Sequence, residues 1–397
     1  MKVLVAHNLY RSDSPSGENL AVETEIGLLR AAGVEVVTHV RSSDEIDGFT
    51  ARQKALLPLR PFRSGEDVRA VEGLIDASRP DVLHLHNPNP LISMSVVDAA
   101  KRRGVPVVMS VHNARHTCIR GSFFRDGHPC HDCQGRAPWP GVVHGCYRGS
   151  RAQSAAAAGA LVAHRGSYRR IDRFLAVSDS VRRELLASGF PAERLTVKPN
   201  ALPDPGPSSP PTTRDVVFVG RMTEEKGVRL LLDAWQHLPD GAQGTLTLAG
   251  SGPLETAARE VAARRSDLVV AGQLDATGVD AVIRRAAAVV IPSVWAEPFG
   301  LVALEAYSRS RPVISTGAGG LADFLGPDRS WQVAPEPAAW ADALAGLDVA
   351  EAARKGAAAR EHYATAYSPD AVITQLTDVY AELAGRAALP GAHRGAS

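Results

Sequence analysis

Two glutamates stand eight positions apart near the end of the chain, in the stretch EPFGLVALE that runs from Glu297 to Glu305. The apolar run VVIPSVWA precedes them and indicates a buried strand. Pro298 suits a first helical turn, so the sequence predicts a helix that begins at Glu297 and continues through Glu305. On one helix the two carboxylates would lie about 12 Å apart and could border one site. Carboxylates accept hydrogen bonds from the paired hydroxyls of a ribose or a hexose, so the spacing indicates a sugar-containing ligand.

The predicted start of this helix is also suited to an anion. The backbone amides of Phe299, Gly300 and Leu301 would lack partners within the helix, and the helix dipole would make this end positive. Upstream, the stretch VGRMTEEKG supplies Arg221 and Lys226 directly after an expected strand. A guanidinium and an ammonium provide charge and donors for phosphate oxygens. Together these groups predict a site for a diphosphate linked to sugars.

Strand and helix patterns alternate through both halves of the chain. Before residue 200 the expected strands are KVLVA, VEVVTHV, DVLHLHN, VPVVMSVHN and RFLAV, with helices such as SGENLAVETEIGLLRAAG between them. After residue 215 the expected strands are VVFVG, TLTLAG, LVVAG, AVVIPS and PVISTG. Six prolines between Pro199 and Asp215 indicate a linker. The alternation predicts two domains with parallel sheets covered on both faces, and a ligand site at the carboxyl ends of the strands, in the cleft between the domains.

Composition and charge narrow the class of protein. Apolar residues make up 45% and charged residues 22% of the 397 residues, as in globular proteins rather than disordered or membrane-spanning ones. The start MKVLVAHNLY has too short an apolar run for a secretory signal, so we expect a cytoplasmic protein. The first 200 residues hold 27 Lys and Arg against 20 Asp and Glu, and the rest hold 17 against 23. The basic half could steer an anionic ligand or make a peripheral contact with the acidic inner face of a membrane, and the alternative is two solvated surfaces that differ in charge.

Three stretches in this order, GRMTEEKG, GSGP and EPFGLVALE, resemble those of the retaining glycosyltransferases of family 4. The resemblance covers nearly the whole chain, from the SGE loop at Ser16 to the last expected helix. It implies an α/β GT-B architecture, in which two Rossmann-like parallel-sheet domains face each other across a cleft. The implied parts are an acceptor-binding domain over residues 1–200, a Pro-rich linker over 201–214, a nucleotide-sugar-binding domain over 215–368, a helix over 369–386 that crosses back to the first domain, and a loose tail over 387–397.

The resemblance also implies roles for the second-domain residues. Arg221 and Lys226 match the pair that binds the donor diphosphate in that family. Glu305 matches the glutamate that binds the ribose. Glu297 matches the glutamate that contacts the transferred sugar and helps it through an oxocarbenium-like state. The amides of residues 299–301 match the backbone that holds the diphosphate and the sugar.

In the first domain the resemblance points to two residues. His112 in SVHNA matches a histidine near the donor sugar at the edge of the cleft. Gly17 matches a glycine in the loop under the diphosphate. The family often has two consecutive glycines in that loop, whereas this chain has Ser16 before Gly17, so the role of Ser16 is open. His84 and His86 alternate on an expected strand, and we interpret them as structural rather than metal-binding because no carboxylate accompanies them in the sequence.

The four cysteines form a compact pattern in the first domain. They lie within 29 residues with the spacing C-x11-C-x2-C-x12-C, and they are Cys118, Cys130, Cys133 and Cys146. Four thiolates at such a spacing suit a tetrahedral structural zinc that would hold an irregular loop. A cytoplasmic setting disfavours disulfides, and thiols without a metal are the alternative.

These observations favour an enzyme that moves a hexosyl or N-acetylhexosaminyl group from a nucleoside diphosphate sugar to a hydroxyl group. The nucleotide, the sugar and the acceptor stay open, and the acceptor could be a cell-envelope or exopolysaccharide intermediate or a natural product. No metal is expected in catalysis, because Arg221, Lys226 and the helix start can take up the charge of the diphosphate. No nucleic-acid partner is expected.

Two other classes compete with this interpretation. A sugar-nucleotide epimerase or hydrolase of the same fold would lack the spacing of Glu297 and Glu305. A hinged sugar-binding module would normally be exported. The stretch GSGP at Gly250 does not continue into a dinucleotide-binding motif, because Glu255 occupies the position of its last glycine.

Overall fold

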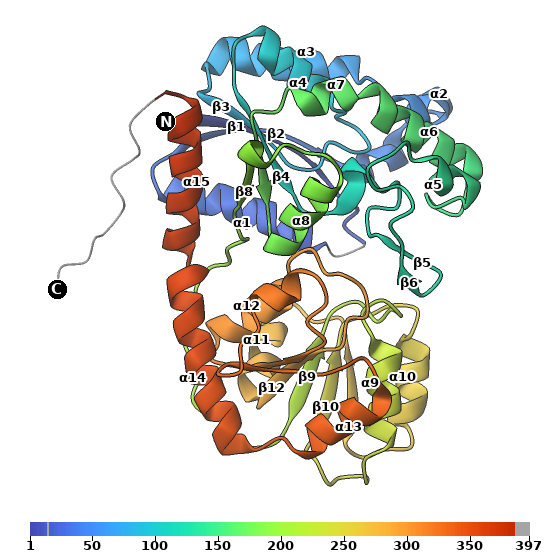
Figure 1. Cartoon of the computed structure of the whole chain (residues 1–397), viewed down its shortest axis with the longest axis vertical. Coiled ribbons are helices and arrows are strands. Elements are labelled where there is room, and N and C mark those ends of the chain that lie inside the picture. The colour runs from blue at the N-terminus through green and yellow to red at the C-terminus, as the bar shows by residue number, and fades with distance from the viewer. Residues whose placement is uncertain (14–15, 386–397) are drawn as a thin grey trace, which may run out of the picture. The chain divides into compact units, whose positions relative to one another are not determined.

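The structure is a computed structural model that describes residues 1–13 and 16–385. The predicted tail over 387–397 and the last residue of the predicted terminal helix lie outside the described residues. The chain folds into two compact units (Figure 1). Within the described residues, unit 1 comprises Met1–Phe123, Cys130–Leu202 and the helix that begins at Pro369, and unit 2 comprises Phe124–Pro129 and Pro203–Ser368.

Unit 1 is built on a parallel sheet of six strands, in the order β2-β1-β3-β4-β7-β8. The strands are β1 (Lys2–Leu9), β2 (Glu35–Ser42), β3 (Val82–Leu85), β4 (Val107–Val111), β7 (Arg173–Ala176) and β8 (Leu195–Val197). The helices are α1 (Gly17–Ala31), α2 (Ala51–Leu56), α3 (Gly65–Ser78), α4 (Ser95–Arg102), α5 (Trp139–Val143), α6 (Arg151–Ala163), α7 (Arg165–Arg169), α8 (Asp179–Ala187) and α15 (Pro369–Leu383). A two-stranded hairpin, β5 (Phe124–Arg125) and β6 (His128–Pro129), interrupts the irregular segment that carries the cysteines.

The sequence explains why α15 belongs to unit 1. Ile373, Leu376, Val379 and Tyr380 recur at helical spacing and pack against Val3 and the other buried residues of β1 and α1. Central strands such as β3 and β4 are buried on every residue, as continuous apolar runs in a parallel sheet require. The last helix of the chain is therefore part of the core of its first unit.

Unit 2 has the same plan, with a parallel sheet in the order β11-β10-β9-β12-β13-β14. The strands are β9 (Val216–Val219), β10 (Leu246–Ala249), β11 (Leu268–Gly272), β12 (Ala288–Ile291), β13 (Val313–Ser315) and β14 (Ser330–Gln332). The helices are α9 (Val228–Gln236), α10 (Glu255–Ala262), α11 (Ala276–Arg285), α12 (Leu301–Ser308), α13 (Pro337–Ala345) and α14 (Val349–Ala366). Two parallel sheets with interleaved helices confirm the predicted α/β architecture of two Rossmann-like domains.

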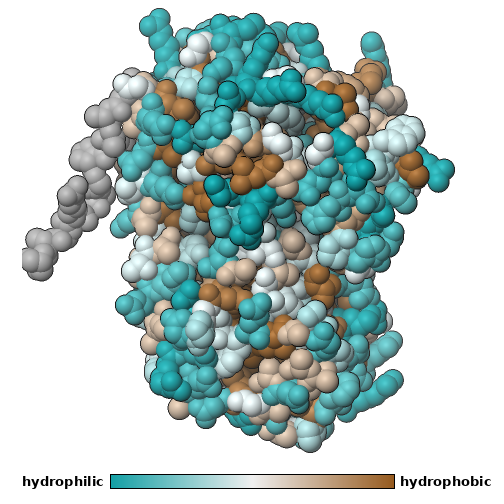
Figure 2. All heavy atoms as spheres, viewed as in Figure 1, coloured by the Kyte–Doolittle hydropathy of each residue, from teal (hydrophilic) through white to brown (hydrophobic). Residues whose placement is uncertain are grey.

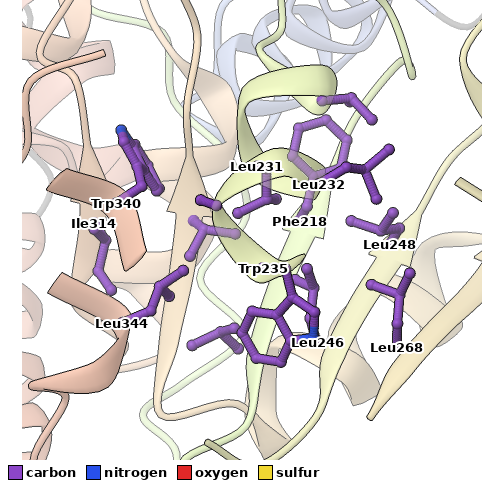
Figure 3. Packing of buried hydrophobic residues seen from close by; sticks show 14 of the residues in the cluster. Phe218, Leu231, Leu232, Trp235, Leu246, Leu248, Leu268, Ile314, Trp340 and Leu344 are labelled. Atoms are coloured by element: carbon purple, nitrogen blue, oxygen red, sulfur yellow. The ribbon is translucent and has the colours of Figure 1, made fainter. Parts of the chain in front are cut away.

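The core of unit 2 fills the space between its sheet and its helices. Figure 3 shows Leu231 and Trp235 of α9 over Phe218 of β9 and the leucines of β10. Trp235 is fully buried, and its indole N–H donates to Asp267 at 3.0 Å, which satisfies its polar atom. Arg265 forms an ion pair with the same carboxylate. This packing fixes β9, β10 and β12, whose carboxyl ends carry the candidate site.

The visible surface is mostly polar. On the face shown in Figure 2, hydrophobic residues occur in small groups among hydrophilic ones. None of the helices within the described ranges combines the length and the apolar character that a membrane span needs.

Candidate functional site

In unit 2, the carboxylate of Glu297 lies at the centre of a group of polar side chains. Glu297 is 6% exposed. Its Oε1 atom accepts a hydrogen bond from Lys226 Nζ at 2.6 Å and another from Ser293 Oγ at 2.6 Å. The ammonium of Lys226 also lies 5.5 Å from the centre of the Trp295 ring. The ion pair and the second donor on the same oxygen offset the free-energy cost of burying this charged carboxylate.

Backbone hydrogen bonds hold Glu297 against the loop after β13. The Glu297 amide donates to the carbonyl of Ala318 at 3.3 Å, and the Gly320 amide donates to the Glu297 carbonyl at 2.6 Å. These bonds form a parallel bridge between Glu297 and Gly319. Gly319 has a φ of +66°, and a side chain there would overlap the backbone of Glu297. Glu297 is therefore held in an extended segment and is not part of a helix.

This bridge corrects the predicted helix start. α12 begins at Leu301, after Gly300, which has a φ of +100°. Proline at position 298 therefore precedes the helix instead of occupying its first turn. The left-handed conformation of Gly300, which few other residues adopt, lets the chain turn from the bridge into the helix. The distance expected for two glutamates on one continuous helix no longer applies.

The amides after Pro298 remain available in the described part of the chain. Those of Phe299, Gly300 and Leu301 donate no backbone hydrogen bond there, whereas the Ala303 amide bonds to the Gly300 carbonyl at 2.9 Å. The last two belong to the cap and first position of α12, where amides lack partners within the helix. Three donors thus follow Glu297 closely in the sequence.

The other two predicted residues of unit 2 do not join this pair. Arg221 follows β9, has a side chain 55% exposed, and lies 3.8 Å from Glu225. Glu305 lies on α12 and is partly buried, and burial raises the pKa of its carboxyl group. Arg309 is the neighbouring cation, but its guanidinium bonds to the Glu305 carbonyl and to Asp280. No described residue donates a hydrogen bond to the Glu305 carboxylate, so its oxygens are available.

In unit 1, His112 follows β4 and pairs with a second histidine. His112 Nε2 and His86 Nδ1 share a hydrogen bond at 3.0 Å, and the two rings are stacked with centroids 5.3 Å apart. His86 Nε2 lies 3.4 Å from Glu25 Oε1. Glu25 comes from α1, so the three side chains form a line from the helix through the sheet edge to His112.

A second branch connects the same carboxylate to the last helix. Lys198 forms a buried ion pair with Glu25, and His84 Nδ1 lies 3.2 Å from Glu25 Oε1. The Tyr380 hydroxyl of α15 bonds to His84 Nδ1 at 2.6 Å, and His84 Nε2 bonds to Ser110 Oγ at 2.9 Å. The reason given from the sequence for treating His84 and His86 as structural was therefore wrong, because Glu25 does accompany them.

Burial and neighbouring charges set the protonation of this cluster. Burial, with smaller contributions from His86 and Lys198, holds the pKa of His112 well below its usual range. Burial likewise lowers the pKa of His84. Burial opposes the charge of Glu25, but Lys198 and the histidines overcome it and hold the pKa of Glu25 well below its usual range. The cluster therefore combines a charged Glu25–Lys198 pair with neutral His84 and His112 near pH 7.

The same three residues are a candidate metal group. Among the described residues, ligand atoms of Glu25, His84 and His86 lie within 4.8 Å of one another. The ammonium of Lys198 pairs with Oε2 of Glu25, and hydrogen bonds engage His84 at both ring nitrogens. An ammonium at this position repels a second cation, so the contacts favour a hydrogen-bonded network over a metal site.

Gly17 is the first residue of α1, and Ser16 precedes it without a side-chain capping bond. Residues 14 and 15 of the same loop lie outside the described ranges. Two residues further, Asn19 Oδ1 accepts from the Tyr10 amide at 3.1 Å and lies 3.3 Å from His7 Nε2. This contact fixes the start of α1 against the carboxyl end of β1.

The cysteines carry thiol groups, with Cys133 buried and the other three half-buried. Burial raises the pKa of the Cys133 thiol, and the thiols of Cys118, Cys146 and Cys130 raise it further. In the described ranges no three of their sulfur atoms lie within 4.8 Å of one another.

Comparisons with known proteins give consistent results. Residues 17–201 match the family described as "Glycosyl transferase 4-like domain", and residues 213–347 match "Glycosyl transferases group 1". The chain is 30% identical over 366 residues to a D-inositol 3-phosphate glycosyltransferase of Pseudarthrobacter chlorophenolicus, with 85% of this chain and 83% of that protein covered. It is 35% identical over 175 residues to a glycogen synthase of Mycobacterium tuberculosis, with 42% of each covered. The chain spans less than half the length of that synthase and of several other curated relatives.

A solved structure shares the fold. The structure of Anabaena HepE in complex with UDP has a TM-score of 0.67, 15% identity, and covers 96% of this chain and 100% of that one.

Sequence reasoning missed most of the supporting residues. Ser293 follows β12 by two positions, and its role was not visible because nothing in a serine's surroundings marks it as a carboxylate partner. Glu25 and Lys198 are 173 positions apart, and only the fold brings them together. The histidines at the ends of β3 and β4 were the available signal, since neighbouring parallel strands end at one edge of the sheet.

Proposed function

Because the chain belongs to the family of GT4-type glycosyltransferases, we propose that it transfers a hexosyl or N-acetylhexosaminyl group from a nucleoside diphosphate sugar to a hydroxyl group, with retention at the anomeric carbon. The observation that carries the proposal is the Lys226–Glu297 pair, whose glutamate is followed in the sequence by three available amides. The pair brings a cation from the loop after β9 onto the carboxylate that precedes this stretch of backbone donors.

The donor diphosphate is assigned to the cations and the amides. An ammonium has three donors, so Lys226 can keep its bond to Glu297 and still donate to a phosphate oxygen. Arg221 is exposed, and its contact with Glu225 is long, at 3.8 Å. Its guanidinium is therefore able to turn toward a phosphate. The amides of residues 299–301 add the positive end of α12. Charge that develops on the leaving diphosphate is then neutralised by the chain, and no metal ion is required.

The two glutamates are assigned to the sugars. The carboxylate of Glu305 accepts no hydrogen bond from the described residues and is suited to the paired hydroxyls of a ribose. Glu297 is already oriented by Lys226 and Ser293. Such a fixed carboxylate can accept from a hydroxyl of the transferred sugar and favour positive charge on its ring. In unit 1, His112 and Gly17 are assigned to the donor by their match to the family.

The stereochemistry follows from the count of carboxylates. A double displacement needs two carboxyl groups on either side of the reacting carbon. Glu297 is the single carboxylate that we assign to the sugar, so we favour a front-side reaction. In that reaction the departing diphosphate takes the proton of the incoming hydroxyl as the new bond forms on the same face.

The donor nucleotide is proposed to be UDP, supported by the complex of HepE with UDP. The acceptor is proposed to be either a cell-envelope or exopolysaccharide intermediate or a natural product. The cysteines are proposed to hold a structural zinc, because their spacing in the sequence and their thiol chemistry supply four ligands of the kind that zinc prefers.

The test is a panel of UDP-, GDP- and TDP-sugars, followed first by thermal shift of the full chain and then by product analysis with the donor that binds. The proposal expects stabilisation by one nucleotide class, and stronger stabilisation by its sugar than by the bare nucleotide. A chain that binds none of them would refute it.

A further inference from the structure

Unit 1 contains a pocket of about 140 Å³ that the assignments above do not use. One wall is the helix α6, which presents Ala156, Ala157 and Ala160 to the pocket. The facing walls include Leu57 and Met94. Three methyl groups on one helix face leave room that larger side chains would fill. A cavity of similar size in another protein holds one benzene molecule, so the space suits an apolar group of roughly six carbons.

The charged side chains at the pocket are positive. Arg115 and Arg148 line it, and no Asp or Glu does. Across the described ranges Arg115 forms no ion pair within 4.0 Å, and its guanidinium contacts the Tyr10 ring at 5.4 Å. The nearby Glu18 is engaged by the Tyr10 hydroxyl and by the Asn113 amide. Arg115 is therefore a guanidinium beside an apolar space without a paired anion.

A second polar group points to a ligand at the same place. Tyr168 lines the pocket and is 9% exposed, and its hydroxyl makes no hydrogen bond with a described residue. Burial raises the pKa of this hydroxyl, and the charge of Arg115, which lines the same pocket, opposes the rise. Neither the Tyr168 hydroxyl nor the half-buried Arg115 guanidinium donates a side-chain hydrogen bond to a described residue, so both can donate to a ligand in the pocket.

The pocket also includes residues that follow the strands β3 and β4 of unit 1. Asn89 follows β3, and Arg115 follows His112 by three positions at the end of β4. Ligands in α/β folds bind at these carboxyl ends of the strands. The cysteine-bearing segment supplies two more lining residues, Ile119 directly after Cys118 and Tyr147 directly after Cys146. That segment thus forms part of the pocket wall.

We propose that this pocket binds the acceptor of the reaction, and that the acceptor is amphipathic and anionic. Its apolar part lies against the alanine face of α6, and its carboxylate or phosphate pairs with Arg115 and the Tyr168 hydroxyl. The identification of this ligand as the acceptor rests on the proposed glycosyl transfer. The chemical class of the ligand follows from the pocket alone, because an unpaired guanidinium next to apolar walls favours an anion on an apolar stem.

The test measures binding of four probes to the full chain by titration calorimetry, namely hexanoate, hexyl phosphate, hexyl glucoside and inorganic phosphate. Hexanoate or hexyl phosphate should bind at least tenfold more tightly than hexyl glucoside or inorganic phosphate, and the stronger of the two identifies the anionic group. Equal binding of the neutral and anionic probes, or no binding of either anionic probe, would overturn the proposal.

Variants with matched controls place the probes. Arg115→Met and Ala157→Phe should each weaken the anionic probe tenfold or more, through lost charge and lost space. Arg120→Met and Ala155→Phe change exposed residues outside the pocket on the same segments and should leave binding within twofold. Circular dichroism and UDP binding check that Ala157→Phe folds. Unchanged probe affinity in a folded Ala157→Phe would contradict the site.

UDP binding to the same protein distinguishes a failure of the pocket proposal from a failure of the proposed transfer. The wild-type chain should bind UDP and the anionic probe together, and mutual exclusion would contradict an acceptor pocket distinct from the donor site. Probe binding without any nucleotide binding would refute the proposed transfer and retain the pocket. Nucleotide binding without probe binding would refute the pocket and leave the proposed transfer standing.

Discussion

The Nδ1 atom of His86 and the Nε2 atom of His112 lie 3.0 Å apart, and Glu25 stands 3.4 Å behind His86. One of the two nitrogens in the His86–His112 hydrogen bond must carry the hydrogen, and the charge of Glu25 near His86 Nε2 influences which tautomer His86 adopts. We therefore treat Glu25 and His86 as positioning residues for His112.

His86→Phe should lower kcat roughly tenfold or more and leave UDP affinity within about threefold, because the ring of His112 loses its fixed orientation and tautomer. His86→Asn, which retains one polar group near His112, should lose less. The comparison needs steady-state kinetics and UDP titration of both variants. Equal loss of kcat and UDP affinity in His86→Phe would indicate a merely structural role.

The buried histidines of unit 1 predict a loss of stability in acid. Burial and His86 lower the pKa of His7 from 6.5 to about 3, and the pKa values of His84 and His112 move in the same direction. An unfolded chain takes up these protons below pH 6.5 and the folded chain does not. The free energy of unfolding should fall by about 1.4 kcal/mol per pH unit for each such histidine as the pH drops below 6.5. Native-state hydrogen exchange of β1 and β3 measures this, and His7→Asn should reduce the slope.

Lys226→Ala and Glu305→Ala should each weaken nucleotide binding tenfold or more, since each removes a charged contact worth roughly 1.5 to 3 kcal/mol. Arg229→Ala is the matched control, because Arg229 follows Lys226 closely and pairs with Glu224 at the surface. Titration calorimetry with UDP measures the nucleotide affinity of each variant. Unchanged affinity in both folded variants would show that the diphosphate and ribose lie elsewhere.

Glu297→Gln should lower kcat far more than it lowers affinity for UDP, which has no sugar for this side chain to touch. The variant keeps a hydrogen-bond acceptor for Lys226 and Ser293 and loses the charge. The linkage of the wild-type product, read by NMR, should keep the α configuration of an α-linked donor. A β-linked product would contradict the front-side reaction.

Transfer should survive EDTA, because the chain supplies the charges that a divalent ion would otherwise provide. Elemental analysis of protein purified without a metal-affinity tag should find one zinc per chain. Stable protein without zinc would leave the cysteines as plain thiols, and activity restored by magnesium or manganese after EDTA would contradict the metal-free reaction.

The overall architecture was predictable because strand and helix patterns are local. The apolar runs of β3, β4, β9 and β12 carry their own signal, and the proline-rich stretch between Val197 and Val216 indeed contains no helix or strand. The placement of Lys226 near the start of α12 followed from the rule that parallel strands end at one edge.

The local geometry of Glu297 was not predictable, because a contact distant in the sequence decides it. Proline at 298 indicated a helix, and the bridge to Gly319 overrode that preference. The Glu25–Lys198 pair escaped detection for the same reason, since neither residue lies in a recognisable motif. Pockets such as the one beside α6 depend on which helix face packs inward, which an alanine-rich sequence does not reveal.

The place of α15 has a consequence for how the protein is made. Tyr380 and its apolar neighbours complete the core of unit 1, whose other elements are finished by residue 202. The ribosome must therefore synthesise all of unit 2 before the core of unit 1 is complete. Until α15 is synthesised, the apolar residues of unit 1 that α15 covers stay uncovered. At about 5 to 20 residues per second this interval lasts roughly ten to forty seconds. During biosynthesis the first unit to be translated is the last to be finished.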